Sequence, residues 1–405
     1  MPVGLSDLPP LLPVTGIRWG VAAAGINKSG LDDLALMEIV PGATTAAVYT
    51  RNAFCAAPVV VAKQHGAAKS ARYLLINSGN ANAGTGERGM QVAKGSCVAV
   101  ADVAGCEFEE VLPFSTGVIG ELLPLDLIRS ALPNVHADLS EDHWGKAASA
   151  IMTTDMVAKG VSKQVDVDGE SVTITGIAKG SGMIRPDMAT ILAYVATDAA
   201  VKPDLLQTLL QCAVDGSFNS ITVDGDTSTN DACVLVATGQ ANIEFSSDAS
   251  PGYAEFAAAL IDVCQTLAQA IIRDGEGATK FITIDVVGGQ DVAECRQVAY
   301  TVAHSPLVKT ALFASDPNWG RILAAVGRAG VEELDVNKVV IHLGDVCIVR
   351  GGGRDEAYTE AAGQAVMGQE EITISVDLGR GGAKAQVWTT DLSYDYVKIN
   401  AEYRT

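Results

Sequence analysis

The sequence predicts a fold that mixes α-helices and β-strands, and two observations carry this prediction. Short apolar runs that favour strands recur along the chain, bounded by Gly, Pro, Asn and Asp. Longer segments with apolar residues at helical spacing lie between these runs. At 405 residues the chain can bury a large core and would ordinarily form two or three domains.

The first half of the chain contains both kinds of element. Residues 1–43 are punctuated by Pro and Gly, so we interpret them as surface loops with one short strand. Alternation over 165–177 predicts a β-hairpin that turns at Asp168-Gly169. Strands are expected at 18–24, 46–54, 73–77, from 111 onward and at 191–198, and helices at 87–104 and 139–150.

The second half continues this mixture. Strands are predicted at 281–287, 297–302, 339–343, 372–376 and 385–390, and helices at 203–213, 254–272, 306–314 and 356–367. Residues 316–321 and 351–353 are expected to be loops. Neither GxGxxG nor GxxxxGK[ST] occurs, so no nucleotide-binding fold is predicted.

Thr190 stands where a loop becomes a predicted strand. The preceding residues include two glycines and a proline, whereas the following residues are apolar. A threonine hydroxyl needs a base, and its own α-amine can serve once the bond after Ala189 has been cut. Taken alone, such a threonine is more often structural.

Other residues suggest a reaction site but leave alternatives open. Thr116 and Gly117 follow a strand and form either an oxyanion hole or a simple strand end. Glu276 lies between two glycines, as a solvated loop residue or a ligand for an ammonium group. Lys179 is either a surface lysine or an anchor for a carboxylate. The loop at 219–231 lacks the Gly and Glu of a calcium-binding EF-hand and is expected to be a turn rich in Asx hydrogen bonds.

The string Lys179-Gly-Ser-Gly-Met-Ile-Arg-Pro-Asp-Met-Ala-Thr190 resembles the self-cleavage motif of the glutamate N-acetyltransferase (ornithine acetyltransferase, ArgJ-type) family of arginine biosynthesis. The resemblance runs along nearly the whole chain and includes Asn-Ser-Gly-Asn-Ala-Asn-Ala at 77–83. One departure is Asp187, where the family more often has Asn. The family resemblance implies an α/β fold, with helices packed on β-sheets, like that of ArgJ and the β-aminopeptidases.

The resemblance also implies the site and the reaction. Self-cleavage between Ala189 and Thr190 would yield an α chain, 1–189, and a β chain, 190–405, associated as an α2β2 heterotetramer. Thr190 would carry the acetyl group of N-acetylornithine to glutamate by a ping-pong mechanism, with no metal or cofactor. Whether acetyl-CoA is also a donor stays open. The oxyanion hole would be Thr116 and Gly117, and the substrate-binding residues would be Thr153, Lys179, Thr190, Glu276, Asn400 and Thr405.

Composition narrows the function classes. A formal net charge of −20 argues against nucleic-acid or anionic-membrane partners, which require a basic surface. The eight cysteines are scattered without a CxxC pair and the five histidines form no triad spacing, which favours a cytoplasmic protein without Ser-His-Asp chemistry. We expect neither a signal peptide nor a membrane span. Two alternatives are a self-processing amidohydrolase or aminopeptidase and a non-catalytic small-molecule-binding protein.

Overall fold

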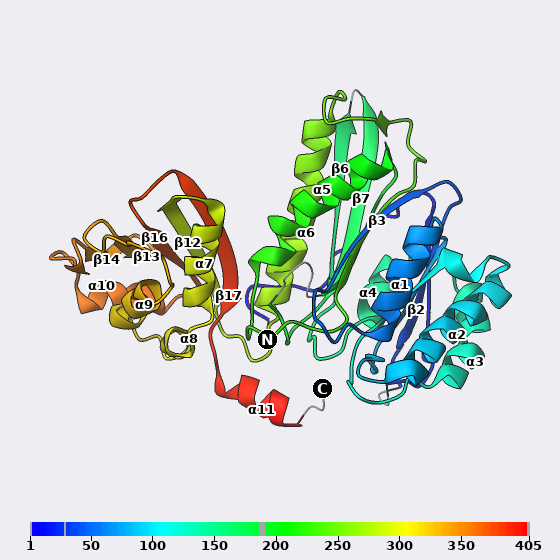
Figure 1. The fold of residues 1–405 in the computed structure, drawn as a ribbon, viewed down its shortest axis with the longest axis horizontal. Helices are drawn as coiled ribbons and strands as arrows, with labels where there is room; N and C mark the ends of the chain where they lie inside the picture. The colour runs from blue at the N-terminus through cyan, green and yellow to red at the C-terminus, as the bar shows by residue number, and fades with distance from the viewer. Residues whose placement is uncertain (1, 28–29, 168, 186–190, 403–405) are drawn as a thin grey trace.

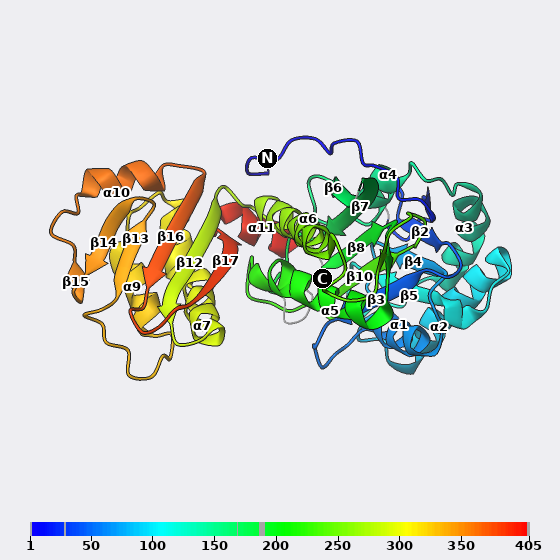
Figure 2. The ribbon, with the colours of Figure 1, turned by 90° about the horizontal axis from the view of Figure 1, so that it is seen from above.

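The computed structural model describes residues 2–27, 30–167, 169–185 and 191–402. These residues form two lobes, seen in Figures 1 and 2, and helices cover the sheets in both. The last helix, α11 (Tyr394–Glu402), leaves the C-terminal lobe and returns toward the N-terminal lobe. The architecture confirms the predicted α/β class.

Two large sheets, whose strands come from distant parts of the sequence, form most of the N-terminal lobe. The first has the order β1-β2-β4-β5, with β1 Ile17–Ala22, β2 Leu34–Ile39, β4 Tyr73–Asn77 and β5 Val111–Ser115. The second has the order β3-β10-β8-β7-β6, with β3 Thr44–Tyr49, β10 Ala232–Ala237, β8 Leu192–Thr197, β7 Glu170–Lys179 and β6 Lys159–Val167. The predicted hairpin is the antiparallel pair β6–β7.

The two sheets pack face to face between helices, giving four layers. In β2, Ala35 and Met37 belong to the core between the sheets, whereas Leu34 and Leu36 pack beneath the helices outside the first sheet. This alternation follows from the two-residue period of a strand. The outer helices are α1 Ala57–Ala68, α2 Gly86–Ala104 and α3 Leu125–Ala137 on the first sheet, and α5 Pro203–Asp215 and α6 Tyr253–Arg273 on the second.

Large aromatic side chains fill the space between the two sheets. Trp19 lies edge-on to both Trp144 and Tyr194, with ring centroids 5.6 and 5.9 Å apart. Phe114 contacts Tyr194 in the same way at 5.5 Å. These edge-to-face contacts stabilise the pair of sheets beyond the area that they bury. Trp144 begins the short helix α4 (Trp144–Ala150).

The C-terminal lobe has its own core around a six-stranded sheet of order β15-β14-β13-β16-β12-β17. Its strands are β12 Phe281–Gly289, β13 Val340–Leu343, β14 Val346–Arg350, β15 Gly353–Arg354, β16 Glu371–Asp377 and β17 Ala383–Thr390. Its helices are α7 Val292–Ala303, α8 Pro306–Phe313, α9 Trp319–Gly327 and α10 Glu360–Met367. The short elements elsewhere are η1 Phe108–Glu110, β9 Ala200–Val201, η2 Phe218–Ser220 and β11 Glu244–Phe245.

Several element predictions are wrong. Residues 297–302, predicted as a strand, lie inside helix α7, whose N-cap Asp291 accepts a hydrogen bond from the Glu294 backbone N–H. Residues 34–39, interpreted as loop, form the buried strand β2. Helices α1, α3 and strand β14 were not predicted, α4 begins only at Trp144, and α9 begins inside the expected loop 316–321.

Helix α6 is long and apolar enough to cross a membrane, although no such run was expected. In this structure its apolar side chains pack against the second sheet instead. Leu260, Val263, Leu267 and Ile271 are all buried in the core that α6 shares with β7 and β8. The helix therefore serves as a core helix of the N-terminal lobe.

Candidate active site

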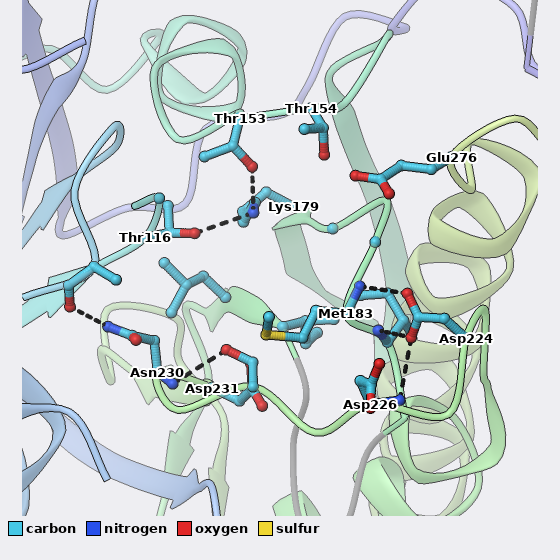
Figure 3. Close-up of a pocket in the computed structure, with 18 of the residues that line it drawn as sticks. Thr116, Thr153, Thr154, Lys179, Met183, Asp224, Asp226, Asn230, Asp231 and Glu276 are labelled. Carbon is cyan, nitrogen blue, oxygen red and sulfur yellow. Dashed lines mark hydrogen bonds between the residues drawn. The ribbon is translucent and has the colours of Figure 1, made fainter. Parts of the chain in front are cut away.

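A cavity of about 200 Å³ lies where β5, β7, the end of α6, the loop 222–231 and α11 meet. Figure 3 shows side chains that line this cavity. Six residues predicted from the sequence line it: Thr116, Gly117, Thr153, Lys179, Glu276 and Asn400. Ala189, Thr190 and Thr405 lie outside the described residues. Ile191 and Leu192, which follow Thr190 in the chain, also line the cavity.

Lys179 supplies positive charge to this cavity. It is the last residue of β7 and pairs with Leu192 of β8 in the antiparallel register. Its Nζ donates to the Thr153 hydroxyl at 2.8 Å and to the Thr116 hydroxyl at 3.1 Å (Figure 3). Among the described residues it has no carboxylate partner within ion-pair distance, because the nearby Asp155 and Asp274 pair with Lys159. Its ammonium is therefore available to an anionic ligand.

A buried ion network of Lys159, Asp155 and Asp274 lies next to Lys179. Lys159 Nζ lies 2.6 Å from both Asp155 Oδ1 and Asp274 Oδ2, and all three side chains are almost fully buried. Asp155 also accepts hydrogen bonds from the backbone N–H groups of Gly180, at 2.7 Å, and Thr153, at 3.1 Å. The network therefore fixes the two segments that carry Lys179 and Thr153.

The pKa values of the network follow from burial and charge. Burial alone would raise the pKa of Asp155, but Lys159 and Lys179 outweigh it and lower this pKa below its ordinary 3.8. Burial alone would lower the pKa of Lys159, but Asp155 and Asp274 outweigh it and raise this pKa above its ordinary 10.5. Because the folded-state pKa of Asp155 is depressed, its contribution to stability is present above pH 3.8 and is lost as the pH falls below that value.

Replacing Lys159 by methionine should destabilise the protein strongly. The change leaves two carboxylates buried without their cation, which costs roughly 3–5 kcal/mol of unfolding free energy. Lys163→Met is the matched control, because Lys163 lies on the same strand and pairs with Asp262 at the surface. The control should lose less than about 1 kcal/mol. Urea unfolding measures both, and equal small losses would contradict a stabilising role for the network.

Gly117 is held in a conformation that only glycine adopts easily. Its φ is +131°, and an added Cβ would lie 2.3 Å from the Gly79 carbonyl carbon and 2.5 Å from the Asn80 nitrogen. The neighbouring N–H groups of Thr116 and Val118 donate to the carbonyls of Asn77 and Gly79. Across the described chain the N–H of Gly117 has no such acceptor. It is thus free to donate to a ligand.

The Thr116 hydroxyl complements this N–H. Its oxygen accepts a hydrogen bond from Lys179, so its own hydrogen remains available to a second acceptor. Residues 77–83 form hydrogen bonds that hold the loop carrying the Thr116 hydroxyl and the Gly117 N–H. Ser115 donates to the Asn77 side chain at 2.6 Å, and Asn77 Nδ2 donates to the Asn80 carbonyl at 2.8 Å. Two donors on one rigid loop suit a carbonyl oxygen that develops negative charge.

Glu276 provides a negative charge on another side of the cavity. Its backbone N–H donates to the Ser181 carbonyl at 2.9 Å, and its Oε2 accepts from Asn400 Nδ2 at 2.7 Å. A Cβ on Gly182 would lie 2.3 Å from this carboxylate, so the close approach requires glycine there. The contact with Asn400 brings α11 from the C-terminal lobe onto the site.

The loop at 222–231 holds the chain just before residues 186–190, which lie outside the described part. Asp224 accepts from the backbone N–H groups of Met183, at 2.7 Å, and Ile184, at 2.9 Å (Figure 3). Thr227 donates its hydroxyl hydrogen to the Arg185 carbonyl at 2.9 Å. The sequence predicted a turn with Asx hydrogen bonds here, and the structure shows the Asp224 side chain binding the backbone of the segment that follows Lys179.

Asp231 is a further acidic residue of the cavity that the sequence did not single out. It directly precedes β10, whose Ala232 N–H donates to the Ile191 carbonyl at 2.8 Å. Burial raises the pKa of this carboxyl well above its ordinary value, with Lys179 acting in the opposite direction. Its neighbour Asn230 donates to the carbonyls of Ala81 and Ser115 and so connects the loop to the first sheet.

The buried network was also missed by sequence reasoning. Asp274 lies 115 residues from Lys159 and Asp155 lies four residues from it, and no local motif connects the three. The only sequence signal is that Asp274 precedes the Gly-Glu-Gly turn that carries Glu276. Spatial proximity of this kind arises from the packing of α6 on β6 and β7 and cannot be read from spacing.

The chain matches known proteins over its full length. The ArgJ family model matches residues 18–405. A protein of Pseudomonas fluorescens (strain Pf0-1), named arginine biosynthesis bifunctional protein ArgJ, is 56% identical over 406 residues and covers 100% of both chains. The protein of that name from Methylococcus capsulatus is 57% identical over 401 residues, covering 99% of this chain and 98% of its own. A crystal structure of arginine biosynthesis bifunctional protein ArgJ from Bacillus halodurans has 40% identity and a TM-score of 0.49, covering 52% of this chain and 98% of that chain.

Proposed function

The chain belongs to the ArgJ family of arginine-biosynthesis acetyltransferases, and on this premise we propose that it transfers the acetyl group of N-acetylornithine to glutamate through an acetyl-threonine intermediate. One observation carries the proposal. A cavity of amino-acid size combines a cation without a carboxylate partner in the described chain, a carboxylate and two free oxyanion donors. Both substrates of this reaction carry a carboxylate, and ornithine carries an ammonium group.

Each charged group has a task in this reaction. Lys179 binds the α-carboxylate of the substrate, and Glu276, held by Asn400, binds the ammonium group of ornithine. Thr153, which orients Lys179, contacts the same end of the substrate. Thr116 and Gly117 donate to the acetyl oxygen. By family resemblance Thr405 adds a contact at the end of the chain.

The reaction proceeds in two displacements. Thr190 Oγ attacks the acetyl carbonyl of N-acetylornithine, while its α-amine accepts the hydroxyl proton. The C–N bond then breaks, and ornithine leaves with that proton on its amine. The glutamate amine attacks the threonine ester, N-acetylglutamate leaves, and the proton returns to the Thr190 oxygen. The two oxyanion donors stabilise both tetrahedral intermediates. No step needs a metal or a redox cofactor.

Self-cleavage between Ala189 and Thr190 creates the α-amine that this mechanism uses. The fragments 1–189 and 190–405 would remain bound, because one sheet combines strands of both, with β10 and β8 of the second fragment between β3 and β7 of the first. In that sheet β7 of the first fragment pairs with β8 of the second, and β3 of the first pairs with β10 of the second. We propose an α2β2 assembly in the cytoplasm, in keeping with eight described cysteines that form no disulfide.

Purified protein tests the proposal directly. A denaturing gel should show two fragments, and N-terminal sequencing of the second should begin at Thr190. Glutamate acetylation is then measured with N-acetylornithine and with acetyl-CoA as separate donors. Sustained ornithine release that requires glutamate, beyond the single equivalent that acetylation of Thr190 releases, supports a transferase. Equal ornithine release without glutamate would instead indicate an amidohydrolase, and a single intact chain without turnover would indicate a binding protein.

The proposed role of Lys179 predicts a pH dependence. Burial lowers the pKa of Lys179 from its ordinary 10.5, with Asp155 acting in the opposite direction. The charged anchor is therefore lost as the pH rises through this lowered value, and the KM for N-acetylornithine should begin to rise at a pH below 10.5. Lys179→Arg keeps its charge at alkaline pH and should lose this rise. The titration of the substrate affects the KM of wild type and of Lys179→Arg equally, so the difference between their pH profiles reports Lys179 alone. Superimposable profiles would contradict the role of Lys179 as the carboxylate anchor.

A further inference from the structure

A second concave site lies beside the loop that carries the cleavage motif. It is a groove of about 850 Å³ lined by arginines from four separate segments. Arg185 follows the cavity residue Ile184, Arg296 lies on α7, and Arg328 follows α9. Arg51, from the loop after β3, is the fourth. The groove therefore concentrates positive charge in a chain whose net charge is −20.

Three of these arginines have no acidic partner in the part of the chain that the structure describes. Within it, neither Arg185, Arg296 nor Arg328 forms an ion pair with a carboxylate. Asp215 is the acidic residue of the groove, and its Oδ1 accepts a hydrogen bond from Asn219 Nδ2 at 2.9 Å. Acidic residues outnumber basic ones 48 to 28 in the chain, so three arginines without a carboxylate partner among the described residues indicate an external anion.

Neutral groups hold these guanidinium groups in place. Arg296 Nη2 donates to the Asp215 carbonyl at 3.1 Å, and Arg328 Nη2 donates to the Thr301 carbonyl at 3.3 Å. The Arg185 guanidinium lies over the Tyr300 ring, 5.5 Å from its centroid. The Nε of Arg296 is buried and has no hydrogen-bond partner within the described chain. Each guanidinium has five N–H donors, so most remain available to a ligand.

The pKa of His304 reflects the positive charges around the groove. Burial, and then repulsion from Arg185, Lys309 and Arg328, lowers its pKa from 6.5 to about 4. The ring is therefore neutral near pH 7, and the charge of the groove comes from guanidinium groups. Because the Thr222 hydroxyl donates to the Ile184 carbonyl at 2.9 Å, His304 Nε2–H must donate to Thr222, at 3.0 Å.

We propose that this groove binds a small ligand that carries two or more phosphate groups. The planar donor fork of arginine matches phosphate oxygens in pairs, and three such forks suit a multiply charged anion better than a single carboxylate. A concave groove of this size fits a small molecule. The strongly negative net charge disfavours nucleic acid, which requires a broad basic surface.

The phosphates could belong to a free nucleotide or to a nucleotide-linked acyl donor. Thr222 contacts both the groove residue His304 and the cavity residue Ile184, so the two sites are separated by a single layer of residues. The cavity of about 200 Å³ accommodates an amino acid but not coenzyme A. The second source rests on the proposed function, whereas phosphate binding itself does not.

Calorimetric titration of the purified protein with inorganic pyrophosphate tests the site. Wild type should bind saturably, and Arg296→Gln/Arg328→Gln should bind at least about 100-fold more weakly, because two charge-assisted contacts are lost. Arg88→Gln/Arg354→Gln is the matched control, since it removes the same charge at exposed positions on α2 and β15. The control should bind as wild type does. Urea unfolding of each variant checks that the fold is retained, and the single change Arg328→Gln, at an exposed side chain, replaces the double variant if it unfolds.

Absence of saturable binding, or equal binding by both double variants, would overturn the proposal. Kinetics then distinguish the two sources. A rise in KM for acetyl-CoA in Arg296→Gln/Arg328→Gln, with the KM for N-acetylornithine unchanged, identifies the phosphates of an acyl donor. A free nucleotide is identified by two results together. The first is that the KM for acetyl-CoA is unchanged in the variant, or that acetyl-CoA does not react at all. The second is that wild type binds ADP saturably and the variant does not.

Discussion

Thr190→Ala should abolish both chain cleavage and acetyl transfer, since the proposed mechanism gives both tasks to one hydroxyl. Loss of a nucleophile lowers kcat by roughly 10⁴-fold or more. The uncut chain also lacks the α-amine that serves as the base. A denaturing gel should therefore show one band of full length, and glutamate acetylation should fall to the background rate.

Thr190→Ser is the matched variant, because serine keeps the hydroxyl and, after cleavage, the α-amine. It should retain part of both activities. Thr154→Ala is a second control, which removes a different hydroxyl from the same cavity and should leave cleavage intact. Full transfer activity in a folded Thr190→Ala protein would show that another group carries the acetyl chemistry.

Gly117→Ala should lower kcat by roughly 10²- to 10³-fold, the loss expected when one oxyanion donor is displaced. The added Cβ would collide with the backbone of Gly79 and Asn80 at 2.3–2.7 Å, and neither position can yield as a flexible side chain would. The backbone must shift, and the free N–H moves with it. The KM for N-acetylornithine should change little, because Lys179 and Glu276 are unaltered.

Gly120→Ala separates this effect from simple backbone strain. Gly120 also has a positive φ, +86°, but a Cβ there meets nothing within 4 Å. It should therefore cost stability of about 1–2 kcal/mol and leave kcat nearly unchanged. Similar losses of kcat in both variants would mean that strain in the loop, and not the position of the Gly117 N–H, controls turnover.

Strands with a clear local signal were predictable from the sequence. Tyr73–Asn77 and Leu192–Thr197 are continuous apolar runs bounded by polar or turn residues, and both are buried strands. The β-hairpin was predictable because its alternation and its Asp-Gly turn agree. In these segments the local preference and the tertiary environment favour the same structure.

The wrong prediction at 297–302 has a physical explanation. Residues 297–302 alternate Val298, Tyr300 and Val302, which resembles a strand over six residues. Over the longer window the buried positions are Cys295, Val298, Ala299 and Val302, which is helical spacing behind the N-cap Asp291. A short window therefore favoured the wrong period. Helix α1 was missed for a related reason, because its run of valines after Pro58 favours a strand locally.

The candidate site was predictable only where a motif carried it. Lys179, Thr116 and Glu276 belong to strings that resemble the family, and the structure brings them to one cavity. The buried network of Asp155, Lys159 and Asp274 belongs to no such string, and its members meet only when α6 packs on β6 and β7. The arginine groove was missed for the same reason, since its members are spread from 51 to 328.

The covalent intermediate is the central claim, and intact-mass analysis tests it most directly. Wild-type protein is incubated with N-acetylornithine in the absence of glutamate and is then quenched in acid. The fragment that begins at Thr190 should gain about 42 daltons, one acetyl group, and should lose it when glutamate is added before the quench. If that fragment never gains mass while transfer proceeds, and ornithine appears only when both substrates are bound, the acetyl group passes directly between substrates and the mechanism is wrong.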